Sequence, residues 1–548
     1  MQLFTAIEEQ STPYTLTRSE LNNQLRYIAL IFSEQGQAAN ACEIMRSLCK
    51  QNPEMAELHR EYAFALKANH QLEEAEIELN TALTLQPVNA NCHAQLARIY
   101  CHTGRVSAGY NSYTKAATIA PSNPNFLQRL VNWSIYSEST GPQGHYQLAR
   151  LWASRAFPGN RAGTNTWRTP QANRQLKIAF VSSGFARSSL ACLISPLLKG
   201  LDRKSFHITV YSDSSMQDID QSLRAHIDDD WQDSSLWSNK QLSTQISNDQ
   251  IDVLINIDGH RDGSRLAVFS NHVAPIQLSW LGYPATTGLN SIDYRISDRV
   301  VDPIGLNEEY YTEKLLRLPN ALLCYAPPAT PSINPSEDQA NIRFGSFIDL
   351  AKVSNLTLDC WAAAMHAVPN SSLCLKQEHL TNHNTHDYLL KQLSERGISS
   401  DRIISSPSTQ SAEQHLNAYN HIDIALDSAP YNDAVSTLEA LWMGVPVVSL
   451  QCQTACSRVS ASILEQVQLG ELATNSVAEY THCILALSKS SDRRQQLRAT
   501  LRKQMHQSQL TNAQQFGHDF GYAIRQKWLA WCQQRNQEQA QPNRAMSR

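Results

Sequence analysis

The front of the chain carries a pattern of small, aromatic and proline residues that recurs every 34 residues. Apolar residues recur at helical spacing within each period. Small residues allow two helices to approach closely, and proline ends a helix because it has no N–H to continue the hydrogen-bond ladder. The pattern therefore predicts repeated pairs of antiparallel helices. The positions that share this spacing are Pro53, Pro87 and Pro121; Ala29, Ala63 and Ala97; Ala41, Ala75 and Gly109; Phe32, Leu66 and Tyr100; and, at a turn, Gly36, His70 and Gly104.

This unit resembles the tetratricopeptide repeat, a helix pair of the same length. We predict three copies over about 22–123 and a decayed fourth copy that begins near Pro124. Stacked pairs of this kind form a curved solenoid whose concave face can bind an extended peptide or a partner protein. A scaffold that only supports the rest of the chain, or that allows it to self-associate, is the alternative at this point.

From Gln175 onward, short apolar runs alternate with helical stretches, which predicts parallel, doubly wound α/β sheets. A proline-rich stretch at 326–335 divides the alternation into two series. Two Rossmann-like halves joined by such a linker leave a cleft at the carboxyl ends of their strands, where ligands bind. We expect strands at 176–183, 207–213, 251–260, 342–347, 371–377, 401–407 and 421–428, and a helix, turn and strand over 436–450.

The predicted organisation has five parts. These are a repeat region over 1–139, a junction over 140–174, an N-terminal Rossmann-like half over 175–330, a C-terminal Rossmann-like half over 340–530, and a frayed polar tail over 531–548.

The charge of the chain is nearly balanced, with 46 Lys and Arg against 50 Asp and Glu among 548 residues. This balance argues against a nucleic-acid-binding protein, which is usually basic. No apolar run reaches the length of a membrane-spanning helix, and the first residues do not resemble a signal peptide, so we expect a cytoplasmic protein. Twelve cysteines occur without a CxxC pair or zinc-ligand spacing, which predicts reduced thiols and no metal site.

Three segments are too specific to follow from composition. They are 274–303, 344–376 and 427–450, the last followed by the serine-rich 457–464. Together they resemble the protein O-GlcNAc transferase and SPINDLY family of GT-B glycosyltransferases, in which tetratricopeptide repeats precede two Rossmann-like domains. The run from Trp280 to Pro284 is the most specific part.

The resemblance implies an enzyme that moves a sugar from a nucleotide sugar to Ser or Thr hydroxyls of an acceptor protein, with inversion and without a metal or other cofactor. UDP-GlcNAc is the default donor. GDP-fucose stays open, because SPINDLY-type relatives use it and nothing in the sequence identifies the base.

The resemblance also implies the roles of residues in the C-terminal half. Lys352, in a pattern with Phe347 and Leu350, falls at the lysine that holds the diphosphate and is expected to be catalytic; an exposed surface lysine is the alternative. Asp349 lies in the same loop, near the nucleotide. Glu439 falls where an acid takes the ribose hydroxyls, although an acid there also complements the helix dipole.

Further positions follow from the same resemblance. His415 aligns with a histidine near the base and sugar. Ser436 and Thr437 supply hydroxyls at a helix N-terminus that should cradle the diphosphate. Thr286 and Thr287 are candidates for donor contacts. His260, which follows a strand, is expected at the mouth of the cleft as a second catalytic residue.

Two loops depart from the family pattern. Residues 433–435 read Asp-Ala-Val where a glycine and threonines are expected. Ser188 and Cys192 stand at two positions where the family has histidine, and Arg187 could add positive charge there. Loss of a positioned acid–base group typically slows a reaction by about 10²–10⁴. A catalytically impaired, partner-binding protein is therefore the alternative to an active transferase.

Overall fold

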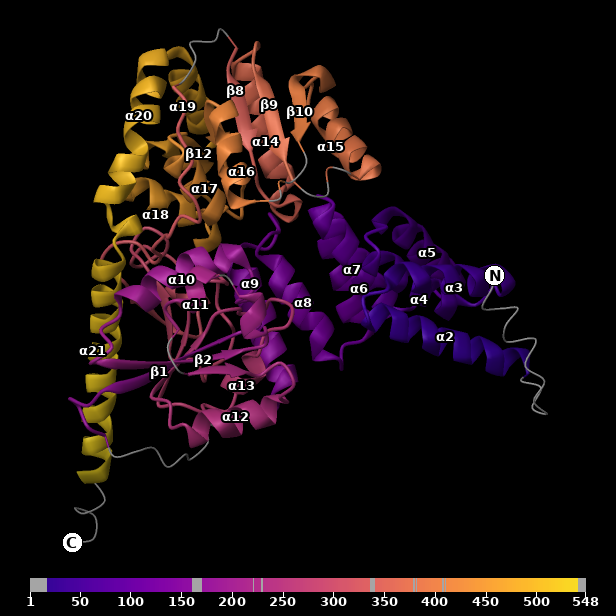
Figure 1. The fold of residues 1–548 in the computed structure, drawn as a ribbon, viewed down its shortest axis with the longest axis horizontal. Helices are drawn as coiled ribbons and strands as arrows, with labels where there is room; N and C mark the ends of the chain where they lie inside the picture. The colour runs from indigo at the N-terminus through magenta and orange to yellow at the C-terminus, as the bar shows by residue number, and fades with distance from the viewer. Residues whose placement is uncertain are drawn as a thin grey trace. The chain divides into compact units, whose positions relative to one another are not determined.

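The computed structural model describes residues 17–159, 170–219, 221–227, 230–335, 341–377, 382–406 and 411–540, together with residues 380 and 409 (Figure 1). The chain forms two compact units. The first comprises residues 1–100 and 111–120, and the second comprises residues 101–110 and everything from Pro121 onward. No helix of the described residues is both long enough and apolar enough to cross a membrane.

Consecutive helices occupy the repeat region, and the predicted turn position has the same conformation in each pair. Gly36, His70 and Gly104 have φ angles of 75°, 58° and 78°, a left-handed conformation that glycine adopts without strain. This confirms the repeating helix pairs. The helices are α2 (Arg18–Glu34), α3 (Ala38–Gln51), α4 (Ala56–Ala68), α5 (Leu72–Leu85), α6 (Ala90–His102), α7 (Val106–Ile119), α8 (Pro124–Ser134) and α9 (Gly141–Ala156).

The core of the first unit lies between α2, α3, α4, α5 and α6. The predicted small residues Ala41, Ala63 and Ala75 are almost fully buried there. Leu66 and Leu79 fill the space beside them with no exposed surface. The close approach that the alanines permit thus explains why the same positions recur.

The first α/β half holds a seven-stranded parallel sheet in the order β3-β2-β1-β4-β5-β6-β7. Its register places Ile178 of β1 between Ile208 and Val253. The strand order reverses at β1 and β4, which puts a ligand crevice beyond the carboxyl ends of these strands. The strands are β1 (Leu176–Ser182), β2 (Phe206–Ser212), β3 (Trp231–Asp233), β4 (Val253–Asn256), β5 (Ile276–Ser279), β6 (Tyr294–Ser297) and β7 (Lys314–Arg317). Its helices are α10 (Ser188–Gly200), α11 (Gln221–Arg224), α12 (Asn239–Asn248) and α13 (Leu266–Phe269).

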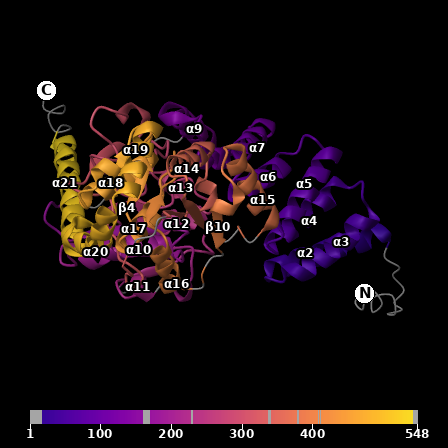
Figure 2. The same ribbon diagram turned by 90° about the horizontal axis from the view of Figure 1, so that it is seen from above.

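The second half holds a six-stranded parallel sheet in the order β10-β9-β8-β11-β12-β13, with its reversal at β8 and β11. A helical repeat region followed along the chain by two parallel sheets confirms the predicted fold class (Figures 1 and 2). The strands are β8 (Arg343–Ser346), β9 (Ser372–Lys376), β10 (Ile403–Ser406), β11 (Ile424–Leu426), β12 (Val447–Leu450) and β13 (Ala473–Thr474). The helices are α14 (Asn355–Ala367), α15 (His383–Glu395), α16 (Ala412–Asn417), α17 (Ala434–Trp442), α18 (Val459–Gln466), α19 (Val477–Lys489) and α20 (Ser491–Gln507).

The last helix, α21 (Ala513–Ala540), crosses the predicted boundary at residue 530 and packs against the first half. Phe516, Phe520 and Trp528 belong to the core of that half, and α21 packs beside α10 (Figure 1). The indole N–H of Trp528 donates to the carbonyl of Gln171 over 3.0 Å. The expected polar tail thus begins inside α21, which continues to Ala540, and Cys532 within it is buried against the first half.

Helix α9 lies in the predicted junction, but it packs as part of the first half. A Cβ atom on Gly288 would lie 2.4 Å from the carbonyl oxygen of Ala149, so the loop and the helix touch backbone to backbone. Gly288 also has a positive φ of 77°. Glycine is required here for both reasons.

Candidate functional site

A cavity of about 460 Å³ lies between the two α/β halves, where the carboxyl ends of their central strands meet. Loops after β1 and β4 line it from one side, and the β8 loop with the N-terminus of α17 lines it from the other. Its charged lining comprises Arg187, Asp258, Arg261 and Arg295 from the first half and Asp349, Lys352, Asp433 and Glu439 from the second.

Lys352 lies at the end of a short 3₁₀ turn that follows β8. Asp349 caps this turn, since its carboxylate accepts the N–H of Ala351 over 2.9 Å. The Lys352 ammonium lies 2.7 Å from the carboxylate of Asp433 and 5.1 Å from the ring centre of Tyr431. Burial alone would lower the pKa of Lys352, but Asp433 and the nearby tyrosines raise it above its ordinary value. The side chain is therefore a fixed positive charge.

The N-terminus of α17 also engages Asp433. The carboxylate of Asp433 caps the helix by accepting the N–H of Ser436 over 3.2 Å. Its own N–H donates to Asp427 over 2.9 Å. A helix N-terminus and a lysine are two groups that ordinarily hold an anion. Here both of them hold the carboxylate of Asp433.

The two hydroxyls predicted on α17 have different surroundings. Ser436 lines the cavity and donates to the carbonyl of Phe347 over 2.9 Å. Thr437 is buried and lies 2.9 Å from the hydroxyl of Ser460, away from the cavity lining. Successive helical residues point in different directions, so one helix turn cannot present both hydroxyls to the same ligand.

Glu439 belongs to a chain of polar contacts that the sequence did not reveal. Lys376 at the end of β9 donates to Nδ1 of His415 over 2.9 Å and to the hydroxyl of Thr409 over 3.0 Å. Because Nδ1 accepts, Nε2 of His415 carries the proton and donates to Oε2 of Glu439 over 2.9 Å. Tyr419 donates to the same oxygen over 3.3 Å.

These contacts fix the Glu439 side chain through one of its two carboxylate oxygens, Oε2. Among the described residues, its second oxygen, Oε1, makes no hydrogen bond, so it can accept one from a ligand. Burial lowers the pKa of Lys376 to about 8, although Glu439 opposes the shift. Lys376 and Tyr419 are positioning residues for Glu439 and His415.

The first half contributes a second charged group to the cavity. Arg187 lies 3.0 Å from the carboxylate of Asp258, which also accepts from Ser182 and Ser183. Burial and the neighbouring Arg261 lower the pKa of Arg187, while Asp258 opposes them. Arg187 belongs to the loop between β1 and α10, Arg261 belongs to the loop after β4, and both line the cavity. Sequence reasoning missed Arg261 because only the fold brings it to this cavity.

The two positions where the resemblance implies histidine, Ser188 and Cys192, both lie on α10. Ser188 begins α10. Cys192 is buried on the same helix, and its thiol donates to the carbonyl of Ser189 over 3.2 Å.

His260 does not lie at the mouth of the cleft, so the predicted position is wrong. Its side chain is only 1 % exposed, and its ring centre lies 4.5 Å from that of Trp152 on α9. Nε2 lies 2.8 Å from the carbonyl oxygen of Thr287. Burial and a smaller effect of His145 lower the pKa of His260 to about 3. The ring is a neutral packing element in this structure, and its catalytic role is a prediction that this geometry does not support.

The two predicted threonines, Thr286 and Thr287 in the loop between β5 and β6, are also inaccessible. The Thr286 hydroxyl donates to Glu313 over 2.6 Å, and the backbone N–H of Thr287 donates to Glu313 over 2.7 Å. All three residues are buried. These hydrogen bonds tie the loop to Glu313, which directly precedes β7. Of the nine predicted site residues, the cavity thus brings together Lys352, Asp349, His415, Ser436 and Glu439, and its lining does not include Thr437, Thr286, Thr287 and His260.

Two parallel sheets whose switch points face a shared cavity define the GT-B architecture. The chain belongs to glycosyl transferase family 41, whose model matches residues 162–325 and 335–520. A sequence relative named "Probable UDP-N-acetylglucosamine–peptide N-acetylglucosaminyltransferase SPINDLY" from Oryza sativa subsp. japonica is 32 % identical over 431 residues. That match covers 77 % of this chain and 46 % of the rice protein.

Other similarities agree with this assignment. The relative of the same name from Arabidopsis thaliana is 31 % identical, over 66 % of this chain and 40 % of its own length. The structure of a Thermobaculum terrenum O-GlcNAc transferase mutant superposes with a TM-score of 0.87 at 28 % identity, covering 95 % of this chain and all of the other. The chain spans about half the length of the curated relatives it matches.

Proposed function

We propose that the protein is an O-linked glycosyltransferase that moves N-acetylglucosamine from UDP-GlcNAc to Ser or Thr hydroxyls of an acceptor protein. The observation that carries the proposal is the convergence of Lys352, the α17 N-terminus and the Glu439 carboxylate on one cavity between the two α/β halves. The names of the family 41 relatives support the choice of donor and acceptor.

Each of these groups suits one part of the donor. Lys352 and the N–H groups at the start of α17 can hold a diphosphate once it takes the place of the Asp433 carboxylate. The Oε1 atom of Glu439 suits a ribose hydroxyl, and His415, held by Lys376 and Glu439, lies beside it for the base.

The reaction is a direct displacement with inversion. The acceptor hydroxyl attacks the anomeric carbon on the face opposite UDP, the carbon–oxygen bond to UDP breaks, and its electron pair leaves with the diphosphate. The hydroxyl proton passes to a carboxylate or to water. Arg187, Arg261 and Lys352 stabilise negative charge on the leaving group, and because none of them accepts a proton, the chemistry depends mainly on that stabilisation.

The repeat unit suits the acceptor. A groove of about 510 Å³ on its helices is lined by Tyr27, Phe64, Asn91 and Gln95 among others. The rings of Tyr27 and Phe64 are 66 % and 52 % exposed. Amide side chains beside exposed aromatic rings fit an extended peptide, whose backbone they can hydrogen-bond.

Titration calorimetry with UDP and GDP tests the donor site, using the intact protein, Lys352→Ala and the control Lys391→Ala, whose lysine is 73 % exposed on α15. We expect UDP to bind the wild type and the control, and Lys352→Ala to bind at least tenfold more weakly. Transfer of labelled GlcNAc to a Ser/Thr peptide tests the reaction. Selective GDP binding would redirect the donor to a GDP-sugar, and UDP binding without transfer would contradict the enzymatic proposal.

A further inference from the structure

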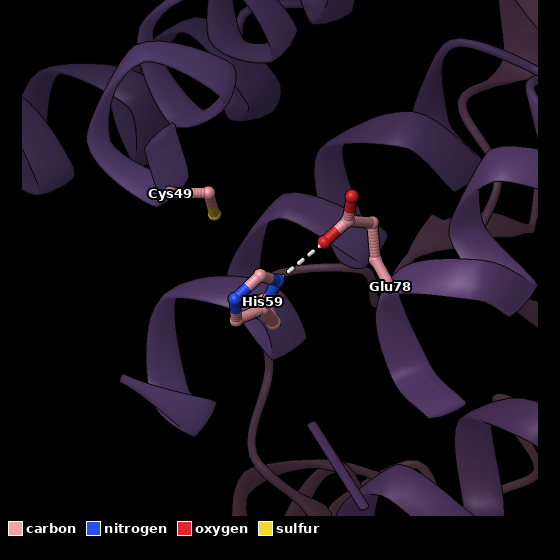
Figure 3. Close-up of side chains that lie close together, drawn as sticks. All are labelled: Cys49, His59 and Glu78. Carbon is pink, nitrogen blue, oxygen red and sulfur yellow. Dashed lines mark hydrogen bonds and ion pairs between the residues drawn. The ribbon is translucent and has the colours of Figure 1, made fainter. Parts of the chain in front are cut away.

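Three side chains that commonly bind metals meet between neighbouring repeats, in the unit that does not carry the donor cavity. Cys49 on α3, His59 on α4 and Glu78 on α5 each offer one ligand atom, and these atoms lie within 4.8 Å of one another (Figure 3). Cys49 and His59 are buried, with 6 % and 8 % exposure, and the Glu78 side chain is 21 % exposed. No other cluster of at least three His, Cys, Asp or Glu ligand atoms this close occurs among the described residues.

The hydrogen bonds of His59 leave one contact that needs an additional positive charge. Nε2 lies 3.0 Å from the carbonyl oxygen of Pro53, which only accepts, so Nε2 carries a proton. Nδ1 lies 2.5 Å from Oε2 of Glu78. A carboxylate also only accepts. In a neutral ring with its proton on Nε2, the lone pair of Nδ1 would therefore face a lone pair of the Glu78 oxygen. Either a second proton on the ring or a cation between the two atoms resolves this conflict.

We propose that Cys49, His59 and Glu78 form a zinc-binding site. Thiolate, imidazole and carboxylate are the three ligand types that Zn²⁺ takes in proteins, and a histidine ligand usually donates its other N–H to a carbonyl or carboxylate, as Nε2 does here to Pro53. Bond lengths of about 2.0–2.3 Å in a tetrahedron separate ligand atoms by roughly 3.3–3.8 Å. The His59–Glu78 contact must therefore widen by about an ångström, which the partly exposed Glu78 allows, and water takes the fourth position.

Zinc binding at this site is coupled to proton release. Burial, with smaller effects of Glu78 and Glu61, raises the pKa of the Cys49 thiol to about 12, so the free group is a thiol. Zn²⁺ displaces its proton to solvent and binds the thiolate. Because α3 belongs to one helix pair and α4 with α5 to the next, the ion would fix two consecutive repeats against each other.

The experiment uses the full chain, stripped with a chelator and dialysed against zinc chloride. We expect one zinc per chain by mass spectrometry, proton release during titration, and a higher melting temperature with zinc. Co²⁺ should give the absorption band of a thiolate–cobalt bond. Cys49→Ala should abolish this band, while Cys42→Ala, which removes another buried thiol of the same helix, should retain it.

Glu78→Gln keeps the size of the side chain and removes one ligand, and we expect zinc affinity to fall by at least about tenfold. Circular dichroism shows whether each variant is folded, and an unchanged UDP affinity separates this site from the donor site. The proposal is overturned if the folded wild type binds no stoichiometric zinc, or if Cys49→Ala binds zinc as tightly as Cys42→Ala. The contact would then be a simple imidazolium–carboxylate ion pair.

Discussion

Asp433 is expected to weaken donor binding, and its replacement by asparagine should strengthen it. The Asp433 carboxylate holds both the ammonium of Lys352 and the N–H of Ser436. A diphosphate would need the same two donors. The Asp433→Asn variant removes the charge but keeps an oxygen that caps α17, since asparagine and aspartate are about equally good at that position.

The structure sets the size of the effect. The Lys352–Asp433 contact of 2.7 Å joins side chains that are only 15 % and 11 % exposed, so solvent screens it weakly. A hydrogen bond to a charged group contributes about 1.5–3 kcal/mol. A nucleotide that takes Lys352 from Asp433 loses this contribution, and each 1.4 kcal/mol changes a dissociation constant about tenfold. Asp433→Asn should therefore bind UDP roughly 10- to 150-fold more tightly.

Titration calorimetry with UDP measures this change directly. Glu439→Gln provides the contrast: it also removes a carboxylate from the cavity, but we expect weaker binding, because the carboxylate is proposed to accept a ribose hydroxyl. Tighter binding by both variants would indicate a general charge effect rather than the release of Lys352. Unchanged or weaker UDP binding by a folded Asp433→Asn variant would refute the reasoning.

Three further predictions concern stability. The pKa of Lys376 is about 8 in the folded chain and 10.5 ordinarily, so the unfolded chain binds more protons between these two pH values. The free energy of unfolding should therefore rise with pH across that window, by up to about 3 kcal/mol. The denaturant midpoint of Lys376→Met should lack this rise. Gly288→Ala should cost at least about 2 kcal/mol, from the strained φ and the clash with Ala149, and a melting temperature equal to wild type would contradict it. Trp528→Ala should cost about 3–5 kcal/mol because the indole is fully buried, whereas Tyr522→Ala, on the same helix with 61 % exposure, should change the melting temperature little.

The sequence allowed the repeat region and the two sheets to be predicted because their signals are local. Alanines and prolines at a fixed spacing indicate helix pairs, and long apolar runs indicate the central strands. The strands β3, β5, β6, β7 and β13, of two to four residues each, were not among the predicted strands. The burial of α21 was hidden by its polar composition, although Phe516, Phe520 and Trp528 lie on one face.

The candidate site was less predictable, because its partners come from distant parts of the chain. The resemblance located Lys352 and Glu439, but not Lys376, which is 63 positions before Glu439 and positions it through His415. His260 was misplaced for a related reason. Its place after a predicted strand suggested the mouth of the cleft, whereas Trp152 of α9 covers the ring, and no local sequence pattern indicates that contact.

Asp433 also affects the balance of positive and negative charge in the cavity. Arg295 is already paired with Asp302. The other charged lining residues are three cations, Arg187, Arg261 and Lys352, and four carboxylates, Asp258, Asp349, Asp433 and Glu439. A nucleotide diphosphate adds more negative charge to this excess, so it must rearrange existing ion pairs instead of entering a positive site.

This balance predicts how salt affects binding. Attraction between an anion and a positive site is screened as ionic strength rises, whereas a site without excess positive charge has little attraction to lose. UDP affinity of the wild type should therefore change little between low and physiological salt. Asp433→Asn leaves equal numbers of cations and carboxylates beside the positive end of α17, so its affinity should fall as salt is added. A wild-type affinity that falls as steeply as that of the variant would show that Asp433 does not govern the charge of the donor site.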